Sequence, residues 1–178
     1  MENIKKGLTI IYIGNGKGKT SAAVGLAVRA AGTGMRVLFL QFVKGDWISG
    51  ERKILESVPN IAVKILGKGF VGIINDDRPF EVHVKAALDA LEQSRQAIVG
   101  GEYDLVILDE ALSAYEAKLI TVDDIADLIK VKPEKVHLCL TGHKRIKKLI
   151  DLADLVTEMK MIKHPYYKGI LAQKGIDF

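Results

Sequence analysis

The sequence predicts one open α/β domain over residues 1–178, with a three-layer arrangement in which helices cover both faces of a mostly parallel sheet. Short apolar runs alternate with helical patterns along the whole chain, which is typical of this architecture. Most of these runs are continuously apolar, as expected of strands that are buried on both faces of a parallel sheet. The length and a hydrophobic content of 48% suit a single domain with a sizeable core.

Six short apolar runs are expected to be strands, and four longer segments have the spacing typical of helices. The expected strands are residues 8–13, 36–42, 62–66, 105–108, 136–141 and 155–159. The expected helices are residues 19–32, 79–100, 121–130 and 144–153. Pro79 suits a first helical turn, Gly100 suits a helix C-terminus, and Thr121 stands as a cap before two aspartates.

Composition narrows the class of protein and its compartment. A net charge of +4 suits an anionic small molecule and also permits weak contact with nucleic acid, so charge does not decide between them. The one cysteine, Cys139, excludes an internal disulfide framework and fits a reducing compartment. No apolar stretch reaches the roughly 18 residues that cross a bilayer, and the apolar run near the N-terminus leads straight into a glycine loop. We therefore expect a cytoplasmic protein without a membrane segment.

The segment GNGKGKT, residues 14–20, has the composition of a phosphate-binding loop. Glycines let the backbone curl so that N–H groups point at anionic oxygens, and the start of the following helix adds about half a positive charge. Lys19 is expected to reach the phosphates, while the Thr20 hydroxyl binds Mg²⁺ and Ser21 supplies a second hydroxyl beside it. The general pattern has glycine at the position of Ile13, so the loop departs from it there.

The second half of the site is expected where the apolar run LVIL ends in Asp109 and Glu110. Carboxylate oxygens suit a hard cation such as Mg²⁺. Because adjacent strand positions point in opposite directions, spacing leaves open which of the two acids touches the metal. Open α/β sheets bind ligands beyond the carboxyl ends of their strands. Three further strand ends therefore count, at Gln41, at the segment 141–143 and at Glu158, and the first two are expected to border the site.

Residues 9–45 closely resemble the opening of the corrinoid adenosyltransferases that use a P-loop, and the similarity extends from about Gly7 to Phe178. That family shares GNGKGKT without glycine at the position of Ile13, and it shares the tail IKHPYYKGILAQKGIDF. The resemblance implies a P-loop, RecA-like architecture. It implies transfer of the 5′-deoxyadenosyl group of ATP to the cobalt of a reduced corrinoid, with release of triphosphate. It also implies ATP lying reversed in the loop, a homodimer, and a reductase or flavoprotein that supplies electrons to the corrinoid.

The resemblance also implies roles for individual residues. Lys19 and Thr20 carry catalysis by stabilising the leaving triphosphate, together with Mg²⁺ and the N–H groups of residues 15–20. Thr20 and Glu110 are the expected metal ligands, with Asp109 as the alternative. No general base is expected, since Co(I) of the corrinoid is the nucleophile. The residues expected to contact ATP or the corrinoid are Gly14, Asn15, Gly16, Lys17, Gly18, Lys19, Thr20, Ser21, Arg29, Gln41, Phe70, Lys163 and His164.

Two other functions stay open from the sequence. A RecA-like ATPase acting on nucleic acid is compatible with the basic segment 143–150, although an aromatic content of 6% offers few platforms for stacking single strands. A binding or carrier protein without turnover is compatible with Val71 and Gly72, which replace two residues that the resembled family commonly has after Phe70. The products of ATP turnover distinguish these functions, because transfer releases triphosphate whereas hydrolysis releases ADP and orthophosphate.

Overall fold

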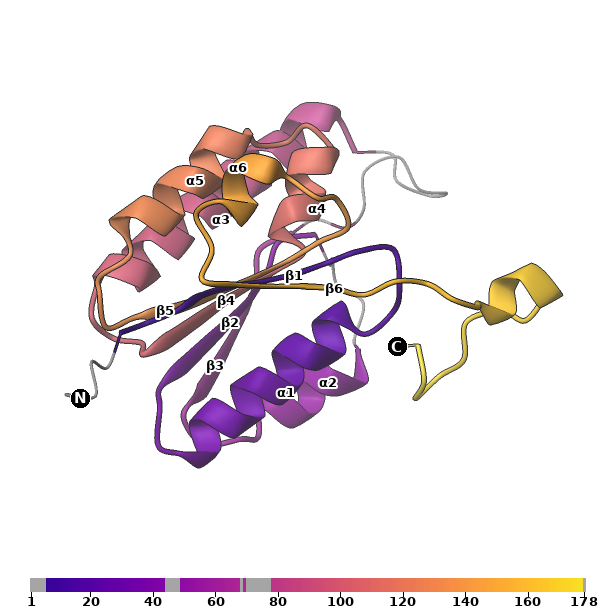
Figure 1. Ribbon diagram of the computed structural model, residues 1–178, viewed down its shortest axis with the longest axis horizontal. Coiled ribbons are helices and arrows are strands. Elements are labelled where there is room, and N and C mark those ends of the chain that lie inside the picture. The colour runs from indigo at the N-terminus through magenta and orange to yellow at the C-terminus, as the bar shows by residue number, and fades with distance from the viewer. Residues whose placement is uncertain (1–5, 44–48, 68, 70–77, 178) are drawn as a thin grey trace.

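The structure, a computed structural model, describes residues 6–43, 49–67, 69 and 78–177, and these residues form a parallel sheet between two layers of helices (Figure 1). The strands in this part of the chain are β1 (Thr9–Ile13), β2 (Val37–Gln41), β3 (Ile61–Ile65), β4 (Leu105–Asp109), β5 (His137–Thr141) and β6 (Leu155–Glu158). Their order in the sheet is β3-β2-β4-β5-β1-β6, and every pairing is parallel. The three-layer prediction is therefore confirmed, and the carboxyl ends of all these strands lie at one edge.

The helices divide between the two faces of the sheet (Figure 1). One face carries α1 (Lys19–Gly32) and α2 (Gly50–Leu55). The other face carries α3 (Phe80–Val99), α4 (Ala111–Glu116), α5 (Val122–Val131) and α6 (Lys147–Ile150). A 3₁₀ turn, η1 (Pro165–Lys168), lies in the C-terminal tail, which projects from the body. None of the helices in the described ranges is long and apolar enough to span a bilayer.

The boundary signals in the sequence are mostly confirmed. Thr121 caps α5 in a reciprocal arrangement, since its hydroxyl accepts from the Asp124 N–H and its own N–H donates to the Asp124 carboxylate at 2.7 Å. Gly100 is the C-terminal cap of α3. Pro79 stands one residue before the predicted place, because it caps the N-terminus of α3 instead of lying in the first turn.

Two helices and the 3₁₀ turn are absent from the prediction, and one predicted helix is shorter than expected. α2 and α4 have six residues each, which is too short to show a helical period in the sequence. The predicted helix over 144–153 forms regular α-helix only at Lys147–Ile150. Of these short elements, α4 follows directly after Asp109 at the carboxyl end of β4, and α2 supplies Gly50 and Glu51 to the wall of a cavity.

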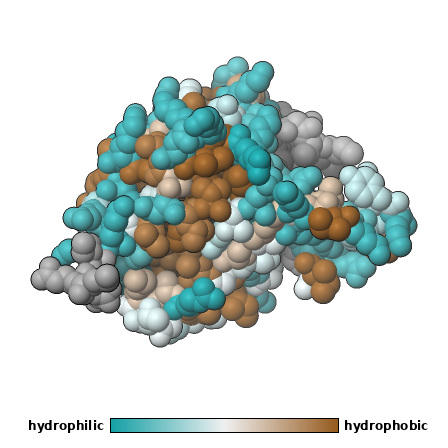
Figure 2. Space-filling view, viewed as in Figure 1, coloured by the Kyte–Doolittle hydropathy of each residue, from teal (hydrophilic) through white to brown (hydrophobic). Residues whose placement is uncertain are grey.

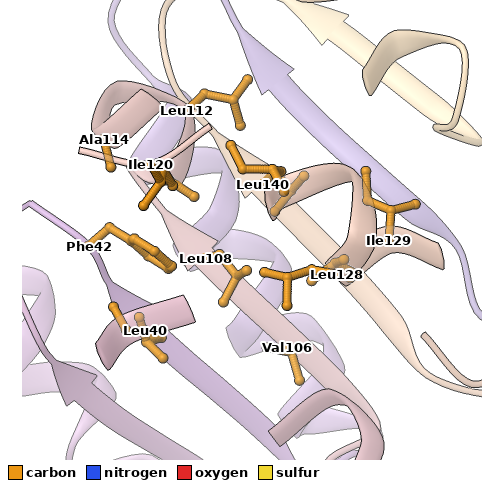
Figure 3. Packing of buried hydrophobic residues seen from close by; sticks show 14 of the residues in the cluster. Leu40, Phe42, Val106, Leu108, Leu112, Ala114, Ile120, Leu128, Ile129 and Leu140 are labelled. Atoms are coloured by element: carbon orange, nitrogen blue, oxygen red, sulfur yellow. The ribbon is translucent and has the colours of Figure 1, made fainter. Parts of the chain in front are cut away.

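Two apolar layers hold the sheet, one on each face. Along β4, Val106 and Leu108 belong to the layer under α3–α6, and Leu105 and Ile107 belong to the layer over α1 and α2. Figure 3 shows the first layer, with Leu128 of α5 packed near the strand residues. A strand with both faces buried has a continuously apolar sequence. This is why the continuous apolar runs in the sequence predicted these strands correctly.

The helix α1 packs closely on the sheet through small side chains. Its buried apolar residues are all alanines, at positions 23, 27, 30 and 31. Small residues let a helix axis approach the strands. The N-terminus of α1 lies at the carboxyl edge of the sheet because α1 follows the end of β1 after a short loop. The loop between β1 and α1 therefore lies beside the ends of β4 and β5.

Candidate functional site

The loop between β1 and α1 requires glycine for two separate reasons. Gly14 and Gly18 have φ angles of 112° and 110°, a region that other residues rarely adopt. Gly14 and Gly16 also lie against the backbone that follows β6. A Cβ on Gly14 would stand 2.3 Å from the Met159 carbonyl oxygen, and a Cβ on Gly16 would stand 2.8 Å from the same oxygen. The glycines thus permit both the curl of the loop and its contact with the chain behind it.

Hydrogen bonds fix the loop in this curled shape. The Gly16 N–H donates to the Met159 carbonyl at 2.8 Å, and the Met161 N–H donates to the Asn15 side-chain oxygen at 3.1 Å. The Gly14 N–H donates to the His143 carbonyl at 3.0 Å. The expectation that every N–H from 15 to 20 faces a phosphate is therefore not met at Gly16, whose donor serves the loop itself.

Lys19 lies beneath the curl of the loop. Its side chain is buried, and its Nζ donates to the carbonyl oxygens of Gly14 and Gly16 at 2.8 and 2.9 Å. Burial lowers the pKa of the Lys19 ammonium, while the neighbouring carboxylates of Glu110, Asp109 and Glu116 act to raise it. The ammonium is thus held at the base of the loop, where the N-terminus of α1 adds its partial positive charge.

Asp109 ends β4 and is completely buried. Its carboxylate accepts hydrogen bonds from the Thr141 hydroxyl at 2.8 Å, the Thr20 hydroxyl at 3.1 Å and the Gln41 amide at 3.3 Å. These donors come from β5, α1 and β2, so the carboxylate ties three neighbouring strand ends to the start of α1. Thr20, Gln41 and Thr141 were all expected near the site, and the structure brings them together on this one side chain.

Glu110 follows Asp109 in the sequence, but its side chain does not enter the core. It has a φ of 61°, a left-handed conformation that costs a residue other than glycine roughly 1–2 kcal/mol. Its N–H donates to the Thr141 hydroxyl at 2.8 Å, and its carboxylate accepts from the Ser113 hydroxyl, whose oxygen lies 3.3 Å from His143 Nδ1. The turn at Glu110 separates the two acids, because Asp109 stays in the core and Glu110 lines a cavity.

The cavity has a volume of about 530 Å³, within the range of small-molecule sites. The loop and α1 form one part of it, and Glu110 before α4, residues of α2 and residues of the C-terminal tail form the rest. Its lining residues are Lys17, Gly18, Lys19, Thr20, Ser21, Val24, Gly50, Glu51, Glu110, Gly175, Ile176 and Asp177. Glu51 and Gly175–Asp177 were missed by the sequence prediction, although the tail is part of the family resemblance.

The oxygen donors beside this cavity suit a hard cation. Thr20 supplies a hydroxyl, and Asp109 and Glu110 supply carboxylates. In the described ranges, no group of three or more His, Cys, Asp or Glu side chains is arranged to hold a metal by itself. This arrangement fits Mg²⁺, which commonly takes one or two protein oxygens together with substrate phosphates and water.

Several of the residues expected at the site lie outside the cavity. Arg29 is exposed in the last turn of α1. Lys163 and His164 lie in the projecting tail, where the His164 ring accepts from the Tyr166 N–H at 3.2 Å. The candidate residue Phe70, with Val71 and Gly72, falls outside the described residues.

A family model and curated relatives of this chain all match corrinoid adenosyltransferases. The model of a family described as ATP:corrinoid adenosyltransferase BtuR/CobO/CobP matches residues 5–178. A corrinoid adenosyltransferase of Sinorhizobium sp is 37% identical over 177 residues, covering 98% of this chain and 81% of that protein. One of Escherichia coli (strain K12) is 31% identical over 174 residues, covering 98% of this chain and 87% of that protein. Among solved structures, a KaiC-like protein of Pyrococcus horikoshii OT3 aligns with a TM-score of 0.55 and 17% identity over 97% of this chain and 76% of its own, which supports the fold.

The contact between Gly16 and the backbone after β6 gives a first prediction. We expect Gly16→Ala to displace Met159 and Lys160, to lower the free energy of unfolding by about 1–3 kcal/mol, and to weaken ATP binding at least about tenfold. Calorimetric titration with ATP and chemical denaturation measure the two effects.

The control is Gly25→Ala in α1, where a Cβ meets nothing within 4 Å. That control is expected to keep ATP affinity and to gain up to ~1 kcal/mol of stability. Wild-type ATP affinity in Gly16→Ala would contradict this account of the loop.

Proposed function

Since the chain belongs to the ATP:corrinoid adenosyltransferase family, we propose that it transfers the 5′-deoxyadenosyl group of ATP to Co(I) of a reduced corrinoid in cobalamin synthesis or salvage. The observation that carries this proposal is the family match over residues 5–178, which includes the loop, the acids after β4 and the tail. The released product would be triphosphate.

The chemistry fits the groups that line the cavity. A bond forms between cobalt and C5′ of the ribose with the electron pair of Co(I), and the C5′–O5′ bond breaks with its pair going to the triphosphate. No proton has to be removed, so the site needs no general base. The protein must instead hold C5′ in line with the cobalt and stabilise the negative charge of the leaving group. Lys19 and the N-terminus of α1 supply positive charge where a triphosphate in the loop would lie.

Magnesium would be held by Thr20 and Glu110, with Asp109 behind them. Glu110 lines the cavity, whereas the Asp109 carboxylate lies in the core and accepts hydrogen bonds from three side-chain donors. When bound, the ion would neutralise charge on the triphosphate as it leaves. The two acids would then have different roles. Asp109 would orient Thr20, and Glu110 would face the ligand.

The basic segment 143–150 gives little support to a role with nucleic acid. Three of its cations are engaged within the chain, since Arg145 pairs with Glu158 at 2.5 Å, Lys147 pairs with Asp151 at 2.6 Å, and Lys148 pairs with Asp123. Cations that are already paired contribute less to phosphate binding. We therefore propose only the transferase function.

Product analysis tests the proposed function. With ATP, Mg²⁺ and chemically reduced cobalamin, the chain is expected to give the adenosylated cobalamin spectrum and free triphosphate. Lys19→Ala is expected to reduce the rate about 10²–10³-fold, because it removes one stabilising charge from the leaving group. The control is Lys85→Ala, an exposed lysine of α3 on the other side of the sheet. ADP and orthophosphate as the only products would refute the transfer, and a wild-type rate in Lys19→Ala would refute the assignment of the loop.

A second experiment distinguishes the two acids. Glu110→Gln is expected to raise the Mg²⁺ concentration needed for half-maximal rate by roughly 10–100-fold without lowering the midpoint of thermal unfolding. Asp109→Asn is expected to lower that midpoint, since it disturbs a buried carboxylate that accepts hydrogen bonds from the side chains of Thr20, Gln41 and Thr141, at a cost of about 1–3 kcal/mol. The reverse pattern, a stable Asp109→Asn with the larger metal requirement, would assign the metal to Asp109.

A homodimer is also part of the proposal. The projecting tail exposes apolar side chains, with Ile162 at 91%, Leu171 at 77% and Tyr167 at 75% of their full exposure. Figure 2 shows apolar surface on this projection, on the right of the view. Several exposed apolar side chains so close together suit contact with a second copy of the chain. Such a contact would bring Lys163 and His164 toward that copy. Sedimentation equilibrium is expected to give about twice the chain mass of 19.5 kDa, and a monomer throughout the micromolar range would contradict it.

The source of electrons for Co(I) would be a separate reductase or flavoprotein.

A further inference from the structure

Lys17 and Asp177 form an ion pair that joins the phosphate loop to the end of the chain. Lys17 is exposed on the loop, whereas the Asp177 side chain is only 11% exposed. In Figure 1 the tail leaves the body after β6, passes through η1 and returns to end beside the N-terminus of α1. The pair therefore lies where the returning tail meets the loop.

The Asp177 carboxylate also closes the turn in which it stands. One oxygen pairs with Lys17, and the other accepts from the Gln173 N–H at 2.7 Å. The Asp177 N–H in turn donates to the Gln173 carbonyl at 2.8 Å, and Gly175 takes a φ of 81° within the turn. Residues 173–177 thus form a closed turn, and its carboxylate is directed at the loop.

This turn forms part of the wall of the cavity. Gly175, Ile176 and Asp177 line it together with Lys17 and the residues that follow in the loop. A carboxylate on the wall of a site for a polyphosphate would repel the ligand unless a cation neutralised it. Lys17 is the cation that the structure places on it. The pair therefore permits the turn to lie over the cavity.

We propose that Lys17 is a positioning residue that fastens the C-terminal turn over the phosphate cavity through Asp177, and that it is not itself a phosphate ligand. The proposal rests on nucleotide binding at the loop, as in the proposed function, and it assigns one wall of the nucleotide site to the end of the chain. Lys19, beneath the loop, then supplies the lysine charge for the phosphates, and Lys17 acts on the nucleotide only by holding the turn.

Two accounts of Lys17 predict opposite effects of removing the Asp177 charge. If Lys17 holds the turn, Lys17→Ala and Asp177→Asn each weaken ATP binding, by about 5–10-fold, and the double variant is no worse than either single variant. The charge-swapped variant, Lys17→Asp with Asp177→Lys, is expected to recover part of the affinity. If Lys17 is a phosphate ligand, Asp177→Asn instead tightens ATP binding, because it frees the lysine and removes a repulsive charge. Tighter binding in Asp177→Asn, additive losses in the double variant, or no change in either single variant would overturn the proposal.

A second readout follows the turn directly. Lys174 offers trypsin a site whose cleavage releases the last four residues, GIDF. Mass spectrometry is expected to show faster release in Lys17→Ala and Asp177→Asn than in the wild-type chain, and slower release from the wild-type chain when ATP is present. Equal release from all three proteins would overturn the proposal. The matched control is Arg95→Ala in α3, away from the cavity, which is expected to change neither ATP affinity nor release.

The same experiment keeps the two proposals apart. A wild-type chain that binds no ATP, or that binds it and yields only ADP and orthophosphate, would refute the proposed function. A wild-type chain that binds ATP and forms triphosphate, with Lys17 and Asp177 variants that behave like it, would refute the role of the turn and leave the transferase function standing.

Discussion

The buried carboxylate of Asp109 is the constraint on which the arrangement of the site depends. A charge without solvent contact is costly unless donors surround it, and here the donors are the side chains of Thr20, Gln41 and Thr141. Those donors belong to different elements, so satisfying one carboxylate fixes β2, β4, β5 and α1 relative to one another at the carboxyl edge. The hydroxyl of Thr20 is thereby oriented before any ligand arrives, which is the kind of preorganisation that favours charge stabilisation in a transition state.

Glu110 shows how the same strand end provides a second, different acid. In a continuing strand the next side chain would point to the opposite face of the sheet, into the other apolar layer. The left-handed turn at Glu110 ends the strand instead and starts α4, with the Thr141 hydroxyl accepting from the Glu110 N–H. Thr141 thus serves both acids, since its hydroxyl also donates to Asp109. One threonine at the end of β5 therefore keeps a buried carboxylate and a cavity-facing carboxylate in adjacent positions.

The sequence was sufficient for the features that depend on local pattern. Continuous apolar runs predicted the buried strands, and GNGKGKT predicted a loop that starts α1 at Lys19. It could not predict the partners that the fold brings from a distance. Neither the ion pair of Lys17 with Asp177 nor the bond from Gly16 to Met159 has a local signature, because each joins residues far apart in the chain. The spacing of Asp109 and Glu110 likewise left their roles open until the backbone angle at Glu110 was known.

Ile13 explains why the loop can lack the glycine of the general pattern. Ile13 is the last residue of β1, is 1% exposed, and belongs to the apolar layer under α3–α6. It pairs in register with Glu158 of β6, and its carbonyl accepts from the Met159 N–H at 2.8 Å. Glycine here would leave a void in that layer and loosen the strand. Because β1 stays paired with β6 through Ile13, the chain after β6 is carried directly behind the loop, where Met159 and Lys160 meet the faces of Gly14 and Gly16. The residue that departs from the general pattern thus fills the apolar layer at the end of β1, and its carbonyl binds the segment that contacts the loop from behind, while the curl from Gly14 to Thr20 forms the phosphate site.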